Sequence, residues 1–234
     1  MLRYQSVVAP ALHVAFTSVD EGNLALHVRD DRDAVLLRRR ELERGLGLDT
    51  TGFTYMNQVH SADVVTLDAS MDATAVRTGD ALLSPDASAP LAVMVADCVP
   101  VVFAGQAGTG AVSAVAHAGR RGLLDGILSN TVAAMREHGA QNIEAWIGPS
   151  ICGSCYEVPE QMAEESETLR PGIRCETKWG SPGLNLPMAA RAELNELNVT
   201  VTDSQRCTLE DQQYFSYRRD SQTGRLAGLI WFED

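Results

Sequence analysis

The 234-residue sequence predicts one domain that mixes α-helices and β-strands. Short, almost continuously apolar runs recur along the chain, as expected of strands that are covered on both faces. Segments with helical spacing of their apolar residues separate these runs. No Ser/Gly/Pro-rich linker and no internal repeat divides the chain, so we expect a single domain over residues 1–234.

The expected strands are short apolar runs, bounded by glycine, proline or polar residues. They are Leu12–Phe16, Val64–Leu67, Leu91–Ala96, Val99–Phe103, Ala111–Ala116, Ile143–Ile147, Val199–Thr202 and Leu226–Phe232. Several have no alternation of polar and apolar residues. This pattern is typical of strands in the middle of a layered fold rather than at a wet surface.

Four segments have the spacing of helices. The segment Asp33–Leu46 places Val35, Leu42 and Leu46 on one helical face, and glycines follow at its end. The next three begin or end at residues that favour helix boundaries, proline at the start or glycine after the end. They are Leu123–His138, Pro159–Leu169 and Pro187–Leu197. Residues 170–183 have neither pattern, and we expect an irregular connection there.

Composition excludes several classes of protein. Hydrophobic residues make up 45% of the chain, which suits a soluble globular domain with its own core. A net charge of −12 argues against binding nucleic acid or an anionic membrane surface. No apolar run approaches the ~18 residues of a membrane span, and the first residues lack a signal pattern. Five cysteines, an odd number, indicate reduced thiols and a cytoplasmic setting.

Three residues stand where strand-like runs stop. His60 follows Asn-Gln-Val, Cys98 follows Ala-Asp, and His117 follows Ala-Val-Ala. Two imidazoles and one thiolate form the ligand set of a catalytic zinc site whose fourth position is left for water or substrate. The residues are too far apart in the sequence for a compact zinc finger. Taken singly, each has a plain alternative, because a lone cysteine is usually a core residue and a lone histidine a hydrogen-bonded one.

The neighbours of these residues add to the case. Asp97 puts a carboxylate at the end of an apolar run, where burial is costly without a partner. The segment from His117 to Gly122 carries glycines that let a ligand approach the backbone, and Arg121, which can bind phosphate. The alternative is a strand-to-helix turn with two solvated arginines. Asp80 and Asp97 are either carboxylates that orient metal ligands or buried structural ones.

Two further segments have open interpretations. Between Cys207 and Asp220, aromatic and polar residues alternate before two arginines. The segment is either a β-hairpin with surface arginines, or a base-stacking Tyr217 beside the anion-binding Arg218 and Arg219. The pair Cys152-Gly-Ser-Cys155 suggests a redox pair or half of a zinc knuckle. No second C-x-x-C exists, and no thioredoxin-like aromatic precedes the pair, which disfavours redox chemistry.

Five motifs occur together in one order. They are Asn-Gln-Val-His60, Ala-Asp-Cys98-Val-Pro-Val, Val-Ala-His117-Ala-Gly-Arg-Arg-Gly, Ile-Gly-Pro-Ser-Ile-Cys-Gly-Ser-Cys155-Tyr-Glu-Val and Phe-Ser-Tyr217-Arg-Arg-Asp with Gly-Arg-Leu-Ala-Gly-Leu-Ile-Trp. The chain therefore resembles the bacterial laccase-domain or polyphenol oxidase family, whose members are regarded as purine nucleoside phosphorylases. The resemblance runs from about Phe16 to the end of the chain.

The resemblance implies an α+β fold, layered α/β/β/α with mixed sheets and related to the catalytic domain of cytotoxic necrotising factor toxins. It implies a Zn²⁺ ion held by His60, Cys98 and His117. It also implies phosphorolysis of adenosine, inosine and methylthioadenosine, with adenosine deamination alongside. The small-molecule partners would then be a nucleoside and phosphate. The phosphate and base would be bound by the residues already singled out, Arg121, Tyr217, Arg218 and Arg219.

Three departures from the family pattern bear on substrate preference. Arg120 stands where the family usually has tryptophan. Cys152 and Ser154 stand where it usually has glycine and cysteine, so only Cys155 matches there. A Gly-Gly-Val-Ser segment expected near residues 18–22 is missing. None of these changes touches the three expected zinc ligands.

Other chemistries use the same residues. Two histidines and a cysteine can also form a copper site, but five histidines and no His-x-His pair are too few for a trinuclear copper cluster, so Cu²⁺ and phenol oxidation are less favoured. Cys98 could instead act as a nucleophile with a histidine base, as in a cysteine hydrolase, although a zinc-bound thiolate is a poor nucleophile. A zinc-stabilised module that binds a partner is the non-catalytic alternative.

Overall fold

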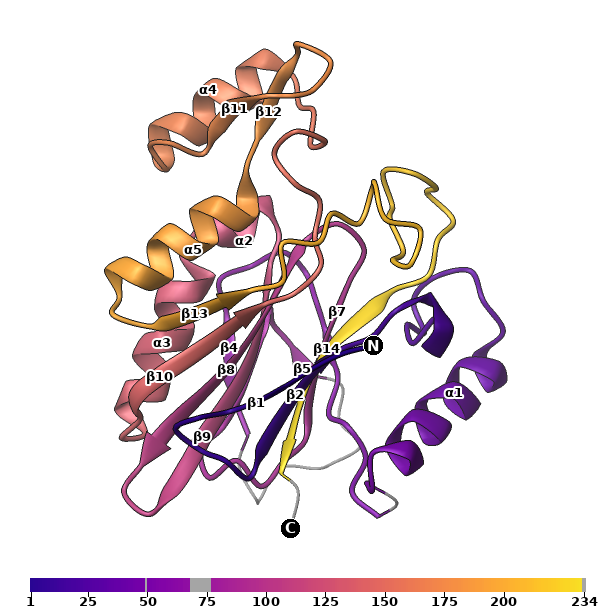
Figure 1. The fold of residues 1–234 in the computed structure, drawn as a ribbon, viewed down its shortest axis with the longest axis vertical. Coiled ribbons are helices and arrows are strands. Elements are labelled where there is room, and N and C mark those ends of the chain that lie inside the picture. The colour runs from indigo at the N-terminus through magenta and orange to yellow at the C-terminus, as the bar shows by residue number, and fades with distance from the viewer. Residues whose placement is uncertain (49, 68–76, 233–234) are drawn as a thin grey trace.

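Two β-sheets pack face to face, and helices cover the outer face of each (Figure 1). This computed structural model describes residues 1–48, 50–67 and 77–232. The predicted α+β class is confirmed, with mixed sheets in a single domain, and the layers follow the α/β/β/α order. The strands of both sheets come from distant parts of the chain, so the fold can bring the ends of separate strands together.

The smaller sheet contains both the first and the last strand of the described chain. Its order is β1 (Leu2–Gln5), β2 (Leu12–Phe16), β14 (Leu226–Phe232) and β7 (Leu91–Val95), with every neighbouring pair antiparallel. Helix α1 (Arg32–Gly45) covers its outer face and begins at Asp31, whose side chain accepts a hydrogen bond from the backbone N–H of Ala34. Leu42 of α1 packs in one cluster with Leu229 and Trp231 of β14.

The larger sheet has six strands and carries most of the core. Its order is β13 (Thr200–Asp203), β10 (Gln141–Ile147), β8 (Val99–Ala107), β9 (Gly110–Ala118), β6 (Ala81–Ser84) and β4 (Val64–Thr66). The two outermost pairs are parallel, and the central ones are antiparallel. Helices α3 (Ile127–Glu137) and α5 (Leu186–Glu196) cover the outer face, and the short α2 (Arg120–Leu124) follows β9.

The space between the sheets is filled by large apolar side chains from both. Phe16 and Ile230 of the small sheet meet Val102, Val115 and Trp146 of the large one. Each is almost completely buried. Burial of such a side chain stabilises the fold by about 1.5–3 kcal/mol, so this layer holds the two sheets in one fixed relation.

The remaining elements lie around these layers. They are the 3₁₀ turn η1 (Val19–Glu21), β3 (Met56–Asn57), β5 (Arg77–Thr78), α4 (Glu160–Leu169), β11 (Arg174–Glu176) and β12 (Pro182–Leu184). Helix α4 and the β11–β12 hairpin form an extension at one end of the molecule, above α2 and α5 in Figure 1.

Two expectations about secondary structure were wrong, and one of two open alternatives is excluded. The helix expected over residues 123–138 is divided into α2 and α3, because Gly126 between them adopts a left-handed φ of 91°. The stretch 170–183 contains β11 and the start of β12. The segment 207–220 is a series of turns in this structure and not a β-hairpin.

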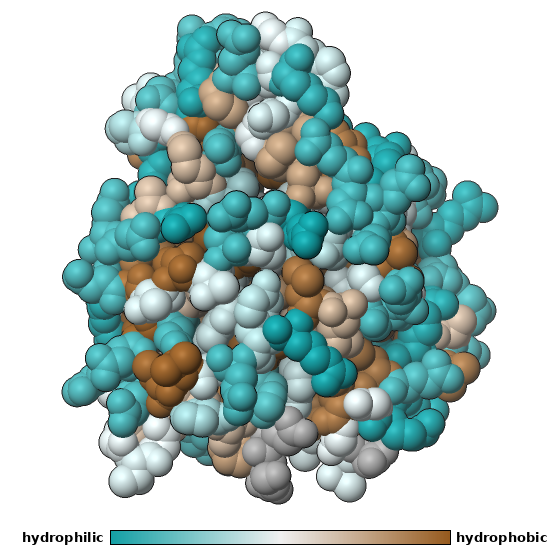
Figure 2. All heavy atoms as spheres, viewed as in Figure 1, coloured by the Kyte–Doolittle hydropathy of each residue, from teal (hydrophilic) through white to brown (hydrophobic). Residues whose placement is uncertain are grey.

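The face shown in Figure 2 is mostly hydrophilic, and its hydrophobic residues lie in separate small patches. None of the described helices combines the length and the apolar composition that crossing a membrane requires.

Candidate metal and nucleoside site

Four strands of the large sheet have ends at the same edge. Strand β4 runs parallel to β6, while β6 and β8 are each antiparallel to β9. The starts of β4, β6 and β8 therefore meet the end of β9. His60 lies in the loop before β4, and Asp80 lies directly before β6. Cys98 lies directly before β8, and His117 is the next-to-last residue of β9.

This arrangement brings the three predicted ligands together. One ligand atom from each of His60, Cys98 and His117 lies within 4.8 Å of the others. The Cys98 sulfur is 3.9 Å from Nε2 of His60, and the two imidazole rings lie 4.7 Å apart, close to perpendicular. His117 is buried, Cys98 is half-buried and His60 is exposed. The group therefore opens to solvent on the side of His60.

Asp80 supports both histidines. Its carboxylate is fully buried, and it accepts a hydrogen bond from Nδ1 of His117 at 2.8 Å. It also accepts backbone N–H bonds from Val59, His60 and Ser61 at 3.1, 3.0 and 2.6 Å. These bonds hold the loop in a shape that includes a left-handed φ of 61° at His60. With Nδ1 bonded to Asp80, Nε2 of His117 is the nitrogen left to act as a ligand.

The electrostatics of the site favour the charged forms of Asp80, Cys98 and His117. Burial acts to raise the pKa of Asp80, but the bonds from His117 and the loop amides lower it to about 2. Burial acts to lower the pKa of His117, but Cys98 and Asp80 raise it to about 9. Burial also opposes ionisation of Cys98, but the nearby His117 and His60 lower its pKa to about 6. Without a cation, the neutral-pH state is a thiolate beside an imidazolium.

Asp97 has a different task from Asp80. It lies where the chain passes from β7 of one sheet to β8 of the other, with a left-handed φ of 85°. Its carboxylate accepts hydrogen bonds from the Thr208 hydroxyl and from the backbone N–H of Arg218, both at 2.6 Å. Asp97 therefore anchors the loop between β13 and β14 beside Cys98.

Gly119 makes room for the site. A Cβ atom at this position would lie 2.7 Å from Cδ2 of His60 and 3.3 Å from the Cys98 sulfur. At Gly122, a Cβ would lie 2.7 Å from the backbone oxygen of Ser61. The glycines expected to admit a ligand thus first admit the His60 loop.

The four predicted substrate residues lie in two segments. The Arg121 side chain is 72% exposed and pairs with Asp125 at 3.5 Å. Tyr217 is 54% exposed, and the Arg225 guanidinium lies 5.8 Å from its ring centre. The Nη1 of Arg218 donates to the backbone oxygen of Glu157 at 2.8 Å.

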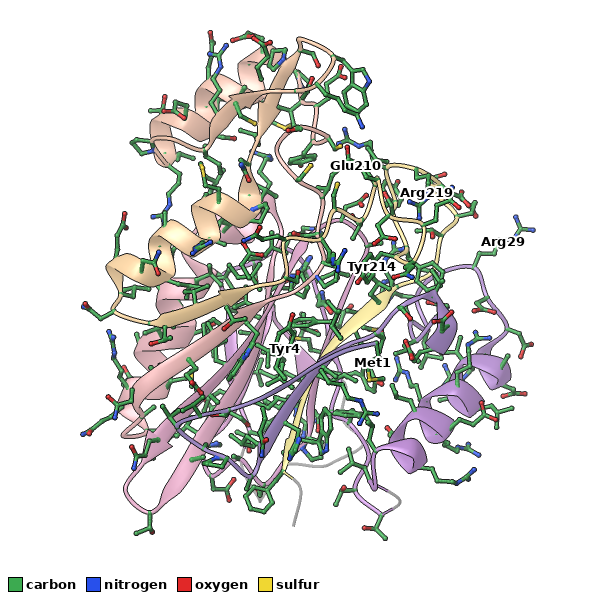
Figure 3. All side chains as sticks on the ribbon, viewed as in Figure 1. Met1, Tyr4, Arg29, Glu210, Tyr214 and Arg219 are labelled. Atoms are coloured by element: carbon green, nitrogen blue, oxygen red, sulfur yellow. The ribbon has the colours of Figure 1, made fainter. Side chains whose placement is uncertain are left out.

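Arg219 is engaged by its own loop. Its guanidinium donates to the backbone oxygens of Thr208, Leu209 and Tyr214. Figure 3 places Arg219 and Glu210 together in the C-terminal loop region, with Tyr214 on its inner side. Arg219 therefore stabilises this loop, and phosphate binding by Arg219 stays a prediction.

Tyr156 was not singled out by sequence reasoning, although it directly follows Cys155. The Arg218 guanidinium lies 5.0 Å from its ring centre. Burial raises the pKa of its hydroxyl, and the nearby Cys98 raises it further. Arg120, the residue that departs from the family pattern, donates to the Ser166 hydroxyl of α4 at 3.5 Å. The sequence signal for Tyr156 was its place in the motif around Cys155, where the cysteines alone were interpreted.

All five cysteines are free thiols, as predicted. Cys98 belongs to the group described above. Cys152 and Cys155 lie instead beside Cys207 and Glu210. The remaining cysteine, Cys175, is half-buried in β11.

Known proteins resemble this chain over nearly its whole length. A purine nucleoside phosphorylase of Streptomyces coelicolor, SCO2081, is 42% identical over 223 residues, which cover 94% of this chain and 91% of that protein. The Escherichia coli purine nucleoside phosphorylase YfiH is 35% identical over 93% of this chain and 89% of its own length.

Solved structures agree with the sequence comparison. The Neisseria meningitidis protein NMB0706 superposes with a TM-score of 0.83 at 32% identity, covering 100% of this chain and 99% of that one. YlmD from Geobacillus stearothermophilus superposes with a TM-score of 0.79 at 30% identity, covering 98% and 94%. The model of the family described as multi-copper polyphenol oxidoreductase laccase matches residues 12–233, so the chain belongs to that family.

Proposed function

We propose that this protein is a metal-dependent purine nucleoside phosphorylase whose metal is bound by His60, Cys98 and His117. The observation that carries the proposal is the convergence of these three side chains within 4.8 Å at one sheet edge. The names of the relatives support the reaction class, since SCO2081 and YfiH are both called purine nucleoside phosphorylases.

The donor set suits zinc. Two imidazoles and one thiolate are borderline ligands that Zn²⁺ binds well, and three protein ligands leave a position for water or substrate. The Asp80 bond to Nδ1 of His117 is the kind of support that metal-binding histidines have. Copper is less favoured, because the described part of the chain brings only two histidines to the site and a trinuclear cluster needs several more.

Phosphorolysis breaks the bond between C1′ of the ribose and the purine nitrogen and joins a phosphate oxygen to C1′. The departing base takes up a proton. A bound zinc ion would supply Lewis acidity at the vacant position. Arg121 and Arg218 are the candidates for binding phosphate, and Tyr217 for stacking on the base. Because Asp97 and Glu157 hold Arg218 in place, its guanidinium needs little reorganisation when phosphate binds.

The finer substrate assignments are adenosine, inosine and methylthioadenosine, with adenosine deamination as a side activity. Deamination would convert adenosine and water to inosine and ammonia at the same site. Arg120, in place of the family's tryptophan, removes an aromatic side chain from the segment after His117. We therefore expect the ranking of nucleosides, rather than the reaction itself, to differ from that of relatives with tryptophan.

The test is incubation of the purified, zinc-loaded protein with each nucleoside, with and without phosphate. Chromatography should show free base and the sugar 1-phosphate (the 5-methylthio derivative from methylthioadenosine) only when phosphate is present, and inosine from adenosine in either case. Cys98→Ala should lose both reactions, while Cys175→Ser, at a thiol outside the site, should keep them. If zinc-loaded protein releases no base from any of the three nucleosides, the assignment is wrong.

One observation favours a second candidate. The thiolate of Cys98 beside a protonated His117 is the arrangement of a cysteine nucleophile and its acid–base partner. A cysteine hydrolase would work better after metal removal, whereas the proposed phosphorylase would stop. Activity measured before and after chelation therefore separates the two. A strong blue absorbance and phenol turnover after copper loading would instead favour the oxidase.

A further inference from the structure

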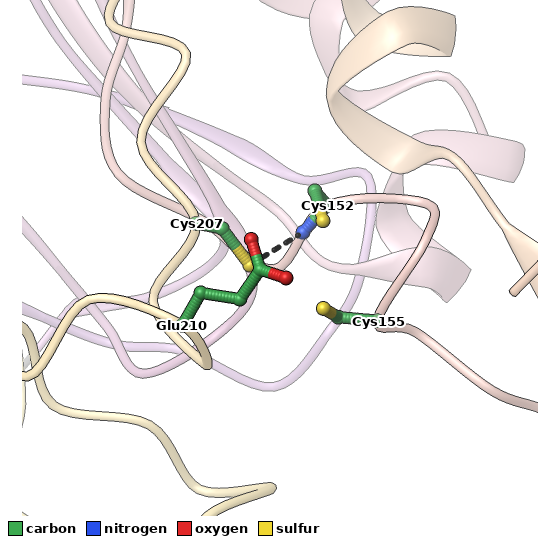
Figure 4. A group of neighbouring side chains, drawn as sticks. All are labelled: Cys152, Cys155, Cys207 and Glu210. Carbon is green, nitrogen blue, oxygen red and sulfur yellow. Dashed lines mark hydrogen bonds between the residues drawn. The ribbon is translucent and has the colours of Figure 1, made fainter. Parts of the chain in front are cut away.

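A second group of metal-binding side chains lies apart from the His60 group. It consists of Cys152, Cys155, Cys207 and Glu210, and one ligand atom from each lies within 4.8 Å of all the others. Figure 4 shows the three sulfur atoms and the carboxylate pointing into a common space. The backbone N–H of Cys152 donates to the Cys207 sulfur at 3.5 Å, which brings the two segments into direct contact.

The four residues come as two pairs with the same spacing. Cys152 and Cys155 enclose two residues, and so do Cys207 and Glu210. Each pair stands on a tight turn. The oxygen of Cys152 accepts from the N–H groups of Cys155 and Tyr156, both at 3.0 Å, and that of Cys207 accepts from Asp211 at 3.0 Å. Two such pairs on facing turns are the arrangement of zinc knuckles.

Backbone bonds align the two turns before any metal binds. Ser150 and Cys207 form a parallel β-bridge. In this bridge, the N–H of Ser150 donates to the backbone oxygen of Arg206 at 3.1 Å, and the N–H of Thr208 donates to the backbone oxygen of Ser150 at 3.1 Å. The ligand pairs therefore face each other in a fixed register, which lowers the entropic cost of closing a site.

We propose that Cys152, Cys155, Cys207 and Glu210 bind a second, structural zinc ion. Three thiolates and a carboxylate complete a four-ligand shell, as structural zinc sites require, and leave no position for substrate. Sulfur atoms around tetrahedral zinc lie about 3.8 Å apart, since each Zn–S bond is about 2.3 Å. The observed spread of up to 4.8 Å needs only side-chain adjustment to reach this geometry.

Lys178 is the neighbour that competes with the metal. Its ammonium group lies 2.9 Å from Oε1 of Glu210, and both side chains are about half exposed. An exposed ion pair of this kind contributes little stability, so it does not prevent Glu210 from binding a cation. Its positive charge instead offsets part of the negative charge of a three-thiolate site.

The zinc would fix the surroundings of Cys98. The two turns that it joins both bond to Asp97. The N–H of Ile151 donates to its backbone oxygen at 2.9 Å, and the Thr208 hydroxyl donates to its carboxylate at 2.6 Å. The same carboxylate holds Arg218. A metal at the second site would therefore stabilise the loop that carries Tyr217 and Arg218 without taking part in the reaction.

Metal analysis of purified protein tests the proposal. The wild type should contain about one zinc ion more than Cys207→Ser, and Cys152→Ser should show the same loss. Cys175→Ser, which alters a thiol outside the group, should keep the wild-type content. His117→Ala should lose the other ion and retain this one, so the outcome does not depend on whether the protein turns over nucleosides.

Cobalt provides a second readout, one that reports the ligand atoms themselves. Co²⁺ added to metal-free, reduced His117→Ala protein should give the intense near-ultraviolet bands of thiolate ligation and the visible bands of tetrahedral cobalt. Glu210→Gln should keep the thiolate bands with weaker affinity. Absence of these bands in the His117→Ala protein overturns the proposal. So does thiol titration that finds two thiols missing until a reductant is added, which would identify a disulfide instead.

Discussion

The carboxylate of Asp80 bonds to the ring of His117 and, through the backbone, to the loop that carries His60. One buried side chain therefore sets the position of two of the three proposed ligands. Asp80→Asn keeps the shape but removes the charge that favours the Nδ1–H tautomer of His117. We expect zinc affinity to fall by about 10–100-fold, as is typical when the support of a ligand is altered. Competition with a chromophoric chelator measures this.

Asp63→Asn is the matched control, because it changes an exposed carboxyl on the same loop. Its zinc affinity should equal that of the wild type. Equal affinity in Asp80→Asn would show that the hydrogen bond to His117 does not support a metal ligand.

Asp80 should also shape the acid stability of the metal-free protein. Its folded pKa is about 2, below the ordinary value of 3.8, so the carboxylate stabilises the fold above that ordinary value. This contribution is lost as pH falls from 3.8 towards 2. The difference in unfolding free energy between the wild type and Asp80→Asn should therefore shrink as pH falls across that window. Urea unfolding in chelator-containing buffers at several pH values measures it; a difference that grows on acidification contradicts the assignment.

Cys98 should be reactive at unusually low pH when no metal is present. Its pKa of about 6 predicts half-maximal alkylation near that pH, well below the ordinary thiol value of 9.0. Iodoacetamide labelling followed by peptide mass analysis reports Cys98 separately from the other four thiols. Added zinc should protect it. Half-maximal labelling near pH 9 in the chelated protein would show that Cys98 and His117 do not form a thiolate–imidazolium pair.

Gly119→Ala tests the close packing around the ligands. The new Cβ would lie 2.7 Å from the His60 ring, so that ring must leave its present position beside Cys98. Because the backbone at Gly119 has a φ of −66°, alanine introduces no conformational strain, and the effect should fall on metal binding. We expect a loss of zinc affinity of at least about tenfold, measured by competition as above.

Gly110→Ala is the control for this change. A Cβ there would lie 3.7 Å from its nearest neighbour, which is ordinary contact. It should bind zinc as tightly as the wild type. If Gly119→Ala also binds normally, His60 does not need its present position to serve as a ligand.

Thr208 should matter for stability through Asp97. Thr208→Val keeps the volume and leaves one oxygen of a buried carboxylate without its hydroxyl donor. The expected loss in unfolding free energy is about 1–3 kcal/mol. Thr200→Val, at an exposed position of β13, should change stability by less than about 0.5 kcal/mol. Calorimetry of both variants checks this, and equal values would mean that Asp97 does not depend on Thr208.

Most central strands were readable because their burial on both faces leaves continuous apolar runs, although the short buried strand β6 was missed. The expected strands over residues 12–16 and 226–232 coincide with β2 and β14. The ends of other runs located His60, Cys98 and His117, since strand ends are where polar side chains are tolerated. Edge strand β1 was missed, because its side chains alternate between half-buried and exposed and no apolar run results.

Contacts between residues far apart in the chain could not be predicted from the sequence. The role of Asp80 depends on the pairing of β6 with β9, which the local sequence does not determine. Cys207 and Glu210 were not recognised as partners of Cys152 and Cys155, because only the fold brings the two turns together. The interruption at Gly126 was hidden for a similar reason, since apolar residues continue on both sides of it.

The β8–β9 hairpin places its connecting turn far from the Cys98 group. The turn that joins its strands lies around Gly108, where the backbone is left-handed and nothing crowds the Cα. The nine residues of β8 place this turn roughly 30 Å from Cys98. A fluorophore or peptide inserted after Gly108 would thus report on the protein from the end opposite its chemistry, and turnover should continue unaltered.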